Sequence, residues 1–488
     1  MKVKELILIL YKYYKNNDYE SVIKSGINNI GLIIKLVGRL IDNRDFDSYN
    51  SVITKDTKLD DKTFDINKMS DGLALMIYMK IILNIIDSKK SLIYNSKEEF
   101  NHALYDIDYP AVLADTKDKL DLFILFLPVY SFEAHGTAFQ LHSRPQFFTA
   151  IDYEFNQREI ALMQINCERA NSDKIKTTSV IWLINPTYLE KDKYDLMIKY
   201  LMRNKKIIKL LHGADSLDVP YMYNTLFNND HDAIMDFTFR YIDTRFLCEL
   251  FRIHQNEEGK CAIYDALLYF KTITKDKYDQ LENTHTNMGP VENISWNIND
   301  LHKDIHSLKY AIFDVLFLKK FIFDIFTRVK NKRENFYKIY ITVSKITQFV
   351  TLERKKITTI VYKLKKRVDV MNNYYFFHNG IKFNLINIFN AVIKHITFRN
   401  INFKFNYLIS INYIRTPLLI IVKAFIYNYI ANIYKVMEKK AHVFNKELID
   451  LTSFWDELQK YYDNTLINFF NYLKKETHNS ISIFLSKH

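Results

Sequence analysis

The chain has 488 residues, 48% of them hydrophobic and 25% charged, which is ordinary for a globular protein of about three domains. The formal net charge is +12. Residues 327–488 carry 27 Lys and Arg against 10 Asp and Glu, a charge of +17, and the rest of the chain carries −5. Such an asymmetry favours a polyanionic partner such as nucleic acid.

The cysteines and apolar segments restrict the protein class further. Cys167, Cys248 and Cys261 stand far apart without a CxxC pair, so the sequence predicts neither a zinc ribbon nor a disulfide framework. This pattern favours a reducing, intracellular compartment such as the cytoplasm. The N-terminus predicts a helix rather than a signal peptide, and the apolar segment 417–434 predicts a buried helix rather than a membrane span. Abundant Lys, Asn, Ile, Tyr and Phe fit an AT-rich genome, such as that of a large DNA virus or an intracellular parasite.

Hydrophobic periodicity divides the chain into three regions. A mostly helical region (1–145) precedes an α/β region (146–326), and a basic, Lys- and aromatic-rich, mainly helical region (327–488) follows. In the middle region, three strands, a helix, a strand, a helix and a strand follow one another. This is the order expected of an RNase H-like domain, a mixed central sheet with flanking helices. The predicted strands are 147–155, 160–167, 179–186, 206–213 and 239–244; the helices are 187–204, 216–227, 244–253 and 304–326; the polar loops are 45–68, 254–260 and 282–293.

An acid pair lies near the end of the first predicted strand, at Asp152 and Glu154. Residues i and i+2 of a strand point to the same face, so the two carboxylates project together. Their neighbours are apolar, and on such a face the two groups would repel each other unless a cation joined them. Oxygen-only ligands favour Mg²⁺ or Mn²⁺. A solvated strand face remains the structural alternative for this pair taken alone.

Two further acidic elements follow along the chain. In LLHGADSLDVPYMYN a short apolar strand leads through a polar turn into a helix, and Asp215 and Asp218 fall near the helix N-terminus, where Asp is also a favoured N-cap. Tyr310 and Asp314 are four residues apart on a predicted helix and therefore share a face. A carboxylate on the apolar face of a helix rich in Ile, Leu and Phe needs a hydrogen-bond donor or a cation beside it. For this pair alone, the alternative is that both residues lie on a solvent-exposed face of the helix.

Taken together, these segments resemble the ribonuclease D branch of the DEDD 3′-to-5′ exonucleases, which includes the exosome-associated nuclease and the Werner-type exonuclease domain. The segment FFTAIDYEFNQREIALMQI resembles the first motif of this family, LLHGADSLDVPYM the second, and ISWNINDLHKDIHSLKYAIFDVLFL the third, Tyr-x-x-x-Asp with a Trp upstream. FRYIDTRFLCELF resembles the Asp-Thr strand end between the second and third motifs. The resemblance covers roughly residues 146–326 and is of the DEDDy type, with a tyrosine in the third motif.

The second motif departs from the family pattern by one residue. The family places its Asp five residues after the His, where this chain has Leu217, and Asp218 comes one later. The segment DVPYM, which begins at Asp218, matches the Asp-Ile-x-x-Leu pattern of the family. We therefore assign Asp218 as the acid of the second motif and keep Asp215 as the alternative.

The resemblance implies hydrolysis of phosphodiester bonds with two divalent metal ions, Mg²⁺ or Mn²⁺. It implies that Asp152 bridges both ions, Glu154 and Asp314 hold the water-activating ion, and Asp218 supports the second. Tyr310 orients the attacking water. The expected substrate is a single-stranded 3′ end, RNA in preference to DNA.

Further residues are candidates for nucleic-acid contacts. Phe155, Met163, Gln164 and Arg158 could touch the terminal nucleotide or its phosphate, with core or surface roles as the alternative, whereas His212 is expected to pack or cap. Basic residues interleaved with aromatics can follow a strand's backbone and stack on its bases; the alternative is a solvated basic face. The basic candidates are Lys355, Lys356, Lys363, Lys365, Lys366 and Arg367.

Three other functions fit parts of the sequence. The first is a nucleic-acid-binding protein built on a catalytically decayed exonuclease fold, which the shifted second motif allows. The second is a DNA-directed repair or proofreading exonuclease, because the motifs are shared between DNA and RNA enzymes. The third is a protein that binds anionic membranes through its basic C-terminal third.

Overall fold

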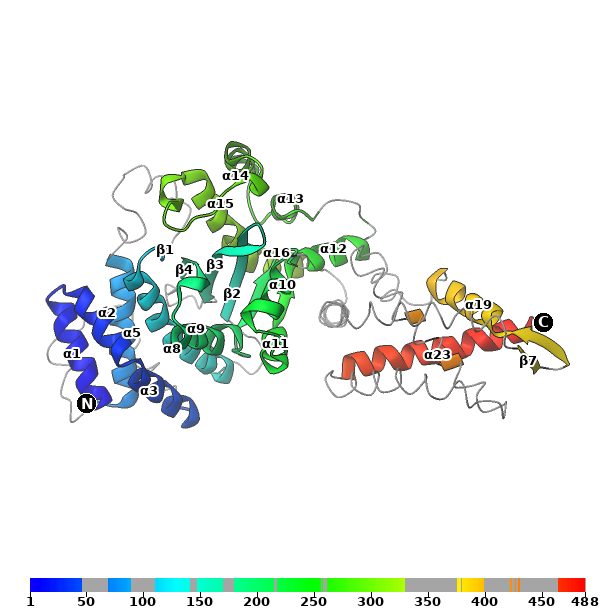
Figure 1. Ribbon diagram of the computed structural model, residues 1–488, viewed down its shortest axis with the longest axis horizontal. Helices are drawn as coiled ribbons and strands as arrows, with labels where there is room; N and C mark the ends of the chain where they lie inside the picture. Colours follow the sequence, from blue (N-terminus) through cyan, green and yellow to red (C-terminus); the bar gives the residue numbers. More distant parts are fainter. Residues whose placement is uncertain are drawn as a thin grey trace. The chain divides into compact units, whose positions relative to one another are not determined.

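The computed structural model comprises two compact units, Met1–Arg252 with Glu258–Arg328, and Ile253–Glu257 with Val329–His488 (Figure 1). Within the described residues, no helix is long and apolar enough to cross a membrane. The structure describes residues 1–45, 69–88, 110–140, 147–169, 180–214, 217–255, 257, 261–329, 375–378, 380–398, 422–423, 426, 429–430 and 464–487.

The first unit is a mixed α/β structure around a six-stranded sheet of order β1-β4-β3-β2-β5-β6. The pairs β1·β4, β2·β5 and β5·β6 are parallel, and β2·β3 and β3·β4 are antiparallel. Each of the five predicted strands is present, so the prediction of a mixed central sheet is confirmed. The strands are β1 (Ala111–Leu113), β2 (Phe147–Asn156), β3 (Glu159–Arg169), β4 (Val180–Ile184), β5 (Ile208–Leu211) and β6 (Tyr241–Asp243).

β2 lies inside the sheet and forms a hairpin with β3. The two turn residues, Gln157 and Arg158, both have positive φ angles, 49° and 79°, as a tight two-residue hairpin turn of the I′ type requires. The register shifts by one residue at a β-bulge between Glu154 and Phe155, which places Asp152 opposite Gln164. The acid pair therefore lies on a strand that has paired neighbours on both sides.

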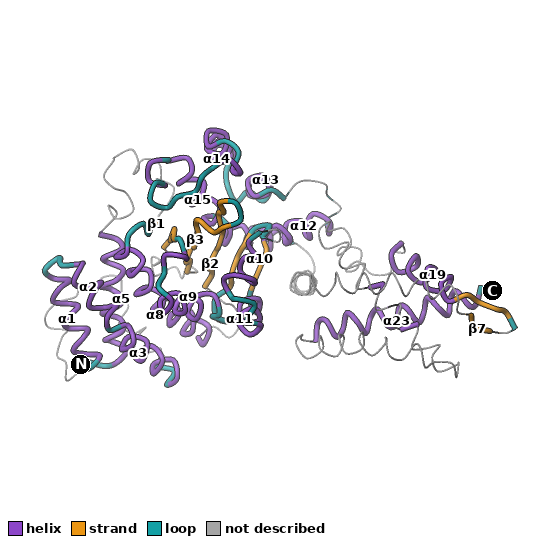
Figure 2. The backbone as a smooth tube through the Cα atoms, viewed as in Figure 1, coloured by secondary structure: helices purple, strands orange, loops and turns teal. Residues whose placement is uncertain are grey.

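Helices cover both faces of the sheet, as Figure 2 shows for α8 and α9 on one side and α15 on the other. Because side chains alternate along a strand, Phe147 contacts Tyr130 of α8 at 5.3 Å between ring centroids, and Phe148 contacts Phe323 of α16 at 5.6 Å. Asp152 and Glu154 have the parity of Phe148 and face α15. The bounds are α8 (Lys117–Gln140), α15 (Ile305–Leu316) and α16 (Leu318–Arg328).

The other helical elements of the α/β region connect the strands and cover the sheet. α9 and α10 each continue into a turn of π-helix. The elements are 3₁₀ turns Pro186–Tyr188, Val291–Asn293 and Leu301–Lys303, α9 (Lys191–Met197) with Ile198–Met202, α10 (Asp218–Tyr221) with Met222–Leu226, α11 (His231–Thr238), α12 (Thr244–His254), α13 (Ile263–Tyr269) and α14 (Lys275–Met288).

The N-terminal region is helical as predicted, with one exception. The helix predicted at the N-terminus is α1, and the Tyr78 hydroxyl of α5 donates to the carbonyl of Leu125 in α8. The exception is Ala111–Leu113, which forms the edge strand β1 and pairs with β4. Three apolar residues that follow a proline suit an edge strand, but they are too few for periodicity to reveal. The helices are α1 (Val3–Lys15), α2 (Tyr19–Asn28), α3 (Ile30–Asp42) and α5 (Asp71–Ser88).

Two predictions for residues 282–326 are corrected. The predicted loop 282–293 begins inside α14, which starts at the Thr274 cap and ends at Gly289, whose φ is 81°; its polar surface hid its helical character. The single helix predicted over 304–326 is divided at Phe317 into α15 and α16. The Asn166 amide of β3 donates to the carbonyl of Val315 at 3.0 Å, which satisfies that group where α15 ends.

A disulfide joins Cys248 of α12 to Cys261, just before α13. The prediction of no disulfide is therefore wrong, and the inference of a reducing compartment loses its support. The spacing of 13 residues has no characteristic sequence signature. The free cysteine among the described residues, Cys167, is buried in β3.

Breaking this disulfide is expected to destabilise the first unit. Closing a loop of this length stabilises a fold by roughly 3 kcal/mol through the unfolded chain. The double variant Cys248→Ala/Cys261→Ala should therefore unfold at a lower urea concentration than the unaltered protein. Reductant should shift the unaltered protein in the same direction and leave the double variant unchanged; identical urea midpoints for the two proteins would contradict this prediction.

The described part of the second unit is a hairpin and two helices. β7 (Tyr375–His378) pairs with β8 (Ile381–Asn384), which leads into α19 (Leu385–Phe398), and α19 packs against α23 (Asn464–Ser486). The His395 ring of α19 lies 2.6 Å from the Ser480 hydroxyl of α23. The predicted basic contacts at 355–367 lie outside the described residues, as do the predicted loop at 46–68 and most of the apolar segment 417–434.

Candidate metal centre

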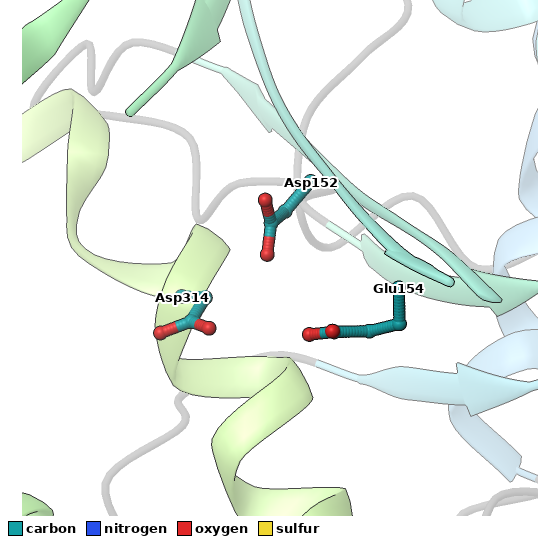
Figure 3. Close-up of side chains that lie close together, drawn as sticks. All are labelled: Asp152, Glu154 and Asp314. Atoms are coloured by element: carbon teal, nitrogen blue, oxygen red, sulfur yellow. The ribbon is translucent and has the colours of Figure 1, made fainter. Parts of the chain in front are cut away.

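β2 and α15 bring three carboxyl groups into one cluster, Asp152, Glu154 and Asp314. One oxygen of each lies within 4.8 Å of the others. Figure 3 shows the three side chains pointing toward a common space between the strand and the helix. The cluster combines the i, i+2 pair of the strand with the helix acid, as the sequence predicted.

The cluster is shielded from water, and no basic side chain of the described residues forms an ion pair with it. Glu154 is 6% exposed, Asp314 is 7% exposed, and Asp152 is partly buried. None of the ion pairs in the described part of the chain involves any of the three. Burial raises the pKa of Asp152 to about 6. Burial and then repulsion from Asp152 raise the pKa of Glu154 and of Asp314 well above their usual range.

Three uncompensated carboxyl groups in a buried cluster are costly for the fold, since each charged form is disfavoured by both burial and its neighbours. A cation at the centre would remove this repulsion. Because all donors are oxygen atoms of carboxyl groups, the set suits Mg²⁺ or Mn²⁺ and lacks the nitrogen and sulfur ligands usual for zinc. The residues present therefore fit a hard divalent cation.

Gln164 supports the cluster from the neighbouring strand. Its side-chain amide donates to the Glu154 carboxylate at 3.1 Å, and the whole side chain is buried. This bond lowers the pKa of Glu154 against the larger effect of burial. The sequence suggested a nucleotide contact for Gln164; the structure places it beneath Glu154, where it orients that carboxylate.

Asp218 begins α10 and lies near the cluster without belonging to it. It is half-buried, and its charge contributes to the raised pKa of Glu154. The residue before it, Leu217, is 51% exposed. The alternative acid, Asp215, lies outside the described residues.

The turn that leads to Asp218 is held by buried polar groups. Asp243 accepts the backbone N–H groups of Gly213 and Ala214 at 3.0 and 3.1 Å. His212 lies with its two ring nitrogens beside the Thr244 hydroxyl, 2.8 Å, and the Cys261 carbonyl, 3.0 Å. Burial lowers the pKa of His212 to about 4, so the ring is neutral at pH 7. Both nitrogens have partners, which agrees with the expected packing role.

Tyr310 stands one helical turn before Asp314 on α15. Its ring stacks on His285 of α14 at 5.9 Å and contacts Trp296 at 6.2 Å between ring centroids. The side-chain amide of Asn156, at the end of β2, binds the backbone of Trp296. It donates to the Trp296 carbonyl at 2.7 Å and accepts from the backbone N–H of Trp296 at 2.9 Å. The negative charge of Asp314, and then burial, raise the pKa of Tyr310 far above its usual value.

Sequence analysis missed a second tyrosine at the cluster. Tyr264 of α13 donates a hydrogen bond to Asp314 at 3.3 Å and is buried. The segment around it, IYDALLY, is an unremarkable amphipathic helix. No local pattern connects it with a carboxylate 50 residues later in the chain.

The other predicted contact residues differ in exposure. Phe155 is half-buried and meets Tyr221 of α10 edge to face at 5.5 Å between ring centroids. Arg158 is exposed in the turn between β2 and β3. Met163 is fully buried, which agrees with the core alternative for this residue.

No family model matches the chain, and no solved structure matches it. The chain is 30% identical over 402 residues to "Uncharacterized protein L533" of Acanthamoeba polyphaga mimivirus. The alignment covers 79% of this chain and 76% of the mimivirus protein. A relative from a giant virus agrees with the composition, which predicted an AT-rich genome such as that of a large DNA virus.

Proposed function

The chain belongs to the family of the mimivirus protein L533, and we propose that it is a metal-dependent 3′-to-5′ exonuclease of the ribonuclease D type. The observation that carries the proposal is the buried cluster of Asp152, Glu154 and Asp314, which forms no ion pair with a basic side chain among the residues that the structure describes. These are three of the four acids that the sequence motifs single out. Clustered acids with strongly raised pKa values are typical of functional sites.

The fold supports the same function. The order β2, β3, β4, α9, β5, α10, α11, β6, α12 follows the order expected of an RNase H-like domain. The acids lie on an inner strand and on a helix that crosses its face. We therefore propose an RNase H-like exonuclease domain at 146–326, extended by the edge strand β1.

The carboxylates would hold the metal, with Asp152, Glu154 and Asp314 as direct ligands and Asp218 supporting a second ion. Bound divalent cations would activate water and stabilise the leaving 3′ oxygen of a phosphodiester. Asp218 lies outside the three-residue cluster, which suits the more distant supporting role proposed for it. Gln164 and Tyr264 orient two of the ligands through their hydrogen bonds.

Tyr310 would orient the attacking water as a hydrogen-bond donor. Its pKa is raised by Asp314 and by burial, so the hydroxyl remains protonated at neutral pH. A phenol in this state can donate a hydrogen bond but is a poor general base. Stacking on His285 and contact with Trp296 fix the ring, and therefore the position of its hydroxyl.

The proposed substrate is a single-stranded 3′ end, RNA in preference to DNA. The basic excess of residues 327–488 suits a polyanion. An assay on end-labelled single-stranded RNA, duplex RNA and matched DNA, with Mg²⁺, Mn²⁺ or EDTA, tests the proposal. We expect metal-dependent release of mononucleotides from the 3′ end of single-stranded RNA. Binding of these substrates without cleavage in either metal would instead indicate a decayed exonuclease.

Asp218→Ala is expected to reduce the nuclease activity far more than Asp215→Ala. Asp218 lies close enough to the cluster to raise the pKa of Glu154. The helix that begins at Asp218 also matches the Asp-Ile-x-x-Leu pattern of the motif, position by position, when Asp218 is taken as its acid. Loss of support for a metal is expected to reduce kcat by about tenfold or more. Single-turnover cleavage by the two variants, at matched metal concentration, measures the difference. If Asp215→Ala is the inactive variant, the second motif has been aligned to the wrong acid.

A further inference from the structure

Asp314 receives a hydrogen bond from an element outside its own helix. Tyr264 lies on α13, and its hydroxyl donates to Oδ1 of Asp314 at 3.3 Å. Tyr310, in contrast, shares α15 with Asp314 and moves with it. Among the described residues, Tyr264 therefore provides the side-chain hydrogen bond that ties this carboxylate to a second helix.

The support behind Tyr264 is firm. α13 follows directly after the disulfide between Cys248 and Cys261. Asp265, the next residue on α13, accepts a hydrogen bond from Tyr278 of α14 at 3.0 Å. α13 is thus anchored on both sides, and the Tyr264 hydroxyl is held at a defined place.

Tyr264 is 7% exposed. A side chain buried this far has little surface with which to touch a nucleic acid. A hydrogen bond to one oxygen of a carboxylate limits rotation of the group and leaves the other oxygen to face a ligand. Groups that orient metal ligands in this way typically change metal affinity by 10- to 100-fold when they are removed.

We propose that Tyr264 is a positioning residue of the metal centre: its hydroxyl fixes the Asp314 carboxylate in the orientation that receives a divalent cation. This role rests on the proposed function only insofar as the cluster of Asp152, Glu154 and Asp314 binds such a cation. It does not depend on which substrate is cleaved, or on whether any is.

The test is direct measurement of Mn²⁺ affinity on the full chain, by calorimetry and by the electron paramagnetic resonance signal of free Mn²⁺. Tyr264→Phe keeps the ring and removes only the hydroxyl. We expect its Kd for Mn²⁺ to rise about tenfold, with a matching rise in the Mn²⁺ concentration that gives half-maximal cleavage. The kcat at saturating Mn²⁺ should stay near that of the unaltered protein, because the hydroxyl does not touch substrate.

Tyr78→Phe is the matched control, since it likewise removes the hydroxyl of a buried tyrosine that donates a hydrogen bond, here to the carbonyl of Leu125, outside the cluster and outside α13. It should leave the Mn²⁺ affinity unchanged, and Asp314→Asn should weaken it more than Tyr264→Phe does. Equal Mn²⁺ affinity for Tyr264→Phe and the unaltered protein would overturn the positioning role, as would equal weakening by Tyr78→Phe. Mn²⁺ binding with no cleavage of any substrate would overturn the exonuclease and leave Tyr264 in its role. No Mn²⁺ binding by the unaltered chain would overturn both.

Discussion

Cleavage of single-stranded RNA is expected to fall by roughly 10²- to 10³-fold when Asp152 is replaced by Asn or Glu154 by Gln. Both changes keep the shape of the side chain and remove the charge that holds the metal. Metal ions contribute several kcal/mol of charge stabilisation to such reactions, and each 1.4 kcal/mol is a factor of ten in rate. Single-turnover rates at saturating Mg²⁺ or Mn²⁺ give the measurement.

The matched control for Glu154→Gln is Glu159→Gln, at the exposed start of β3. It makes the same chemical change a few residues away, outside the cluster, and should leave the rate unchanged. Circular dichroism and urea unfolding would show that each variant is folded. Undiminished cleavage by the folded double variant Asp152→Asn/Glu154→Gln would rule out this cluster as the active site.

Local patterns predicted the sheet and the strand and helix faces that carry the acids, for a physical reason. β2 alternates strictly enough that the parity of Asp152 and Glu154 fixes their common face. The helical spacing fixes the face of Asp314 in the same way. That these two faces meet is a tertiary fact, and the family resemblance, rather than periodicity, made it predictable.

The features that the sequence did not predict depend on contacts between segments that are distant in the chain, or on short segments of polar residues. Tyr264 meets Asp314 only because α13 and α15 both pack against α14, and the disulfide forms only because Cys261, just before α13, lies beside α12. α14 reads as a loop because its surface is polar, yet it carries His285 to the ring of Tyr310. Such a helix is stabilised by packing of its apolar face, and when few residues form that face, the hydrophobic periodicity in the sequence is weak.

The shifted second motif is the local departure that the structure clarifies in part. Leu217 occupies the position where the ribonuclease D motif, which the sequence resembles, has an acid, and Leu217 is about half exposed. The helix begins one residue later, at Asp218, which lies near Glu154. One residue later than in the motif that the sequence resembles, the chain still brings an acid close to Glu154.

Without a divalent metal, the protein is expected to lose stability as the pH rises from about 4 to above 6. The folded-state pKa of Asp152 is about 6, against 3.8 for the ordinary group. Between these values the folded protein binds more protons than the unfolded chain, so the free energy of unfolding falls as the pH rises. The loss of stability that Asp152 causes is complete once the pH exceeds the folded-state pKa of Asp152. Glu154 and Asp314 shift in the same direction.

The size of this effect is measured as a difference between proteins, because other carboxyl groups act in the opposite direction. Asp236, for example, has a pKa lowered by Lys205 and Arg203 against burial, and it contributes stability that is lost at low pH. Asp152→Asn leaves such groups unchanged and removes one charge from the cluster. In EDTA at pH 8 this variant should be more stable than the unaltered protein, by up to roughly 3 kcal/mol for a shift of about two pKa units.

Metal should narrow this difference in stability. A cation that binds the folded protein alone stabilises it in proportion to the logarithm of its concentration over Kd. The measurement compares urea unfolding at pH 4, 6 and 8, in EDTA and in 10 mM Mn²⁺ (about 100 times a Kd on the order of 0.1 mM). At pH 8, where the carboxyl groups are ionised, the unaltered protein should gain about 2.7 kcal/mol from Mn²⁺ and Asp152→Asn should gain much less. Replacing a catalytic acid would thus stabilise the empty protein and remove its response to metal. If Asp152→Asn has the same pH profile as the unaltered protein in EDTA, the raised pKa of Asp152, and with it the electrostatic argument for a metal at this cluster, is wrong.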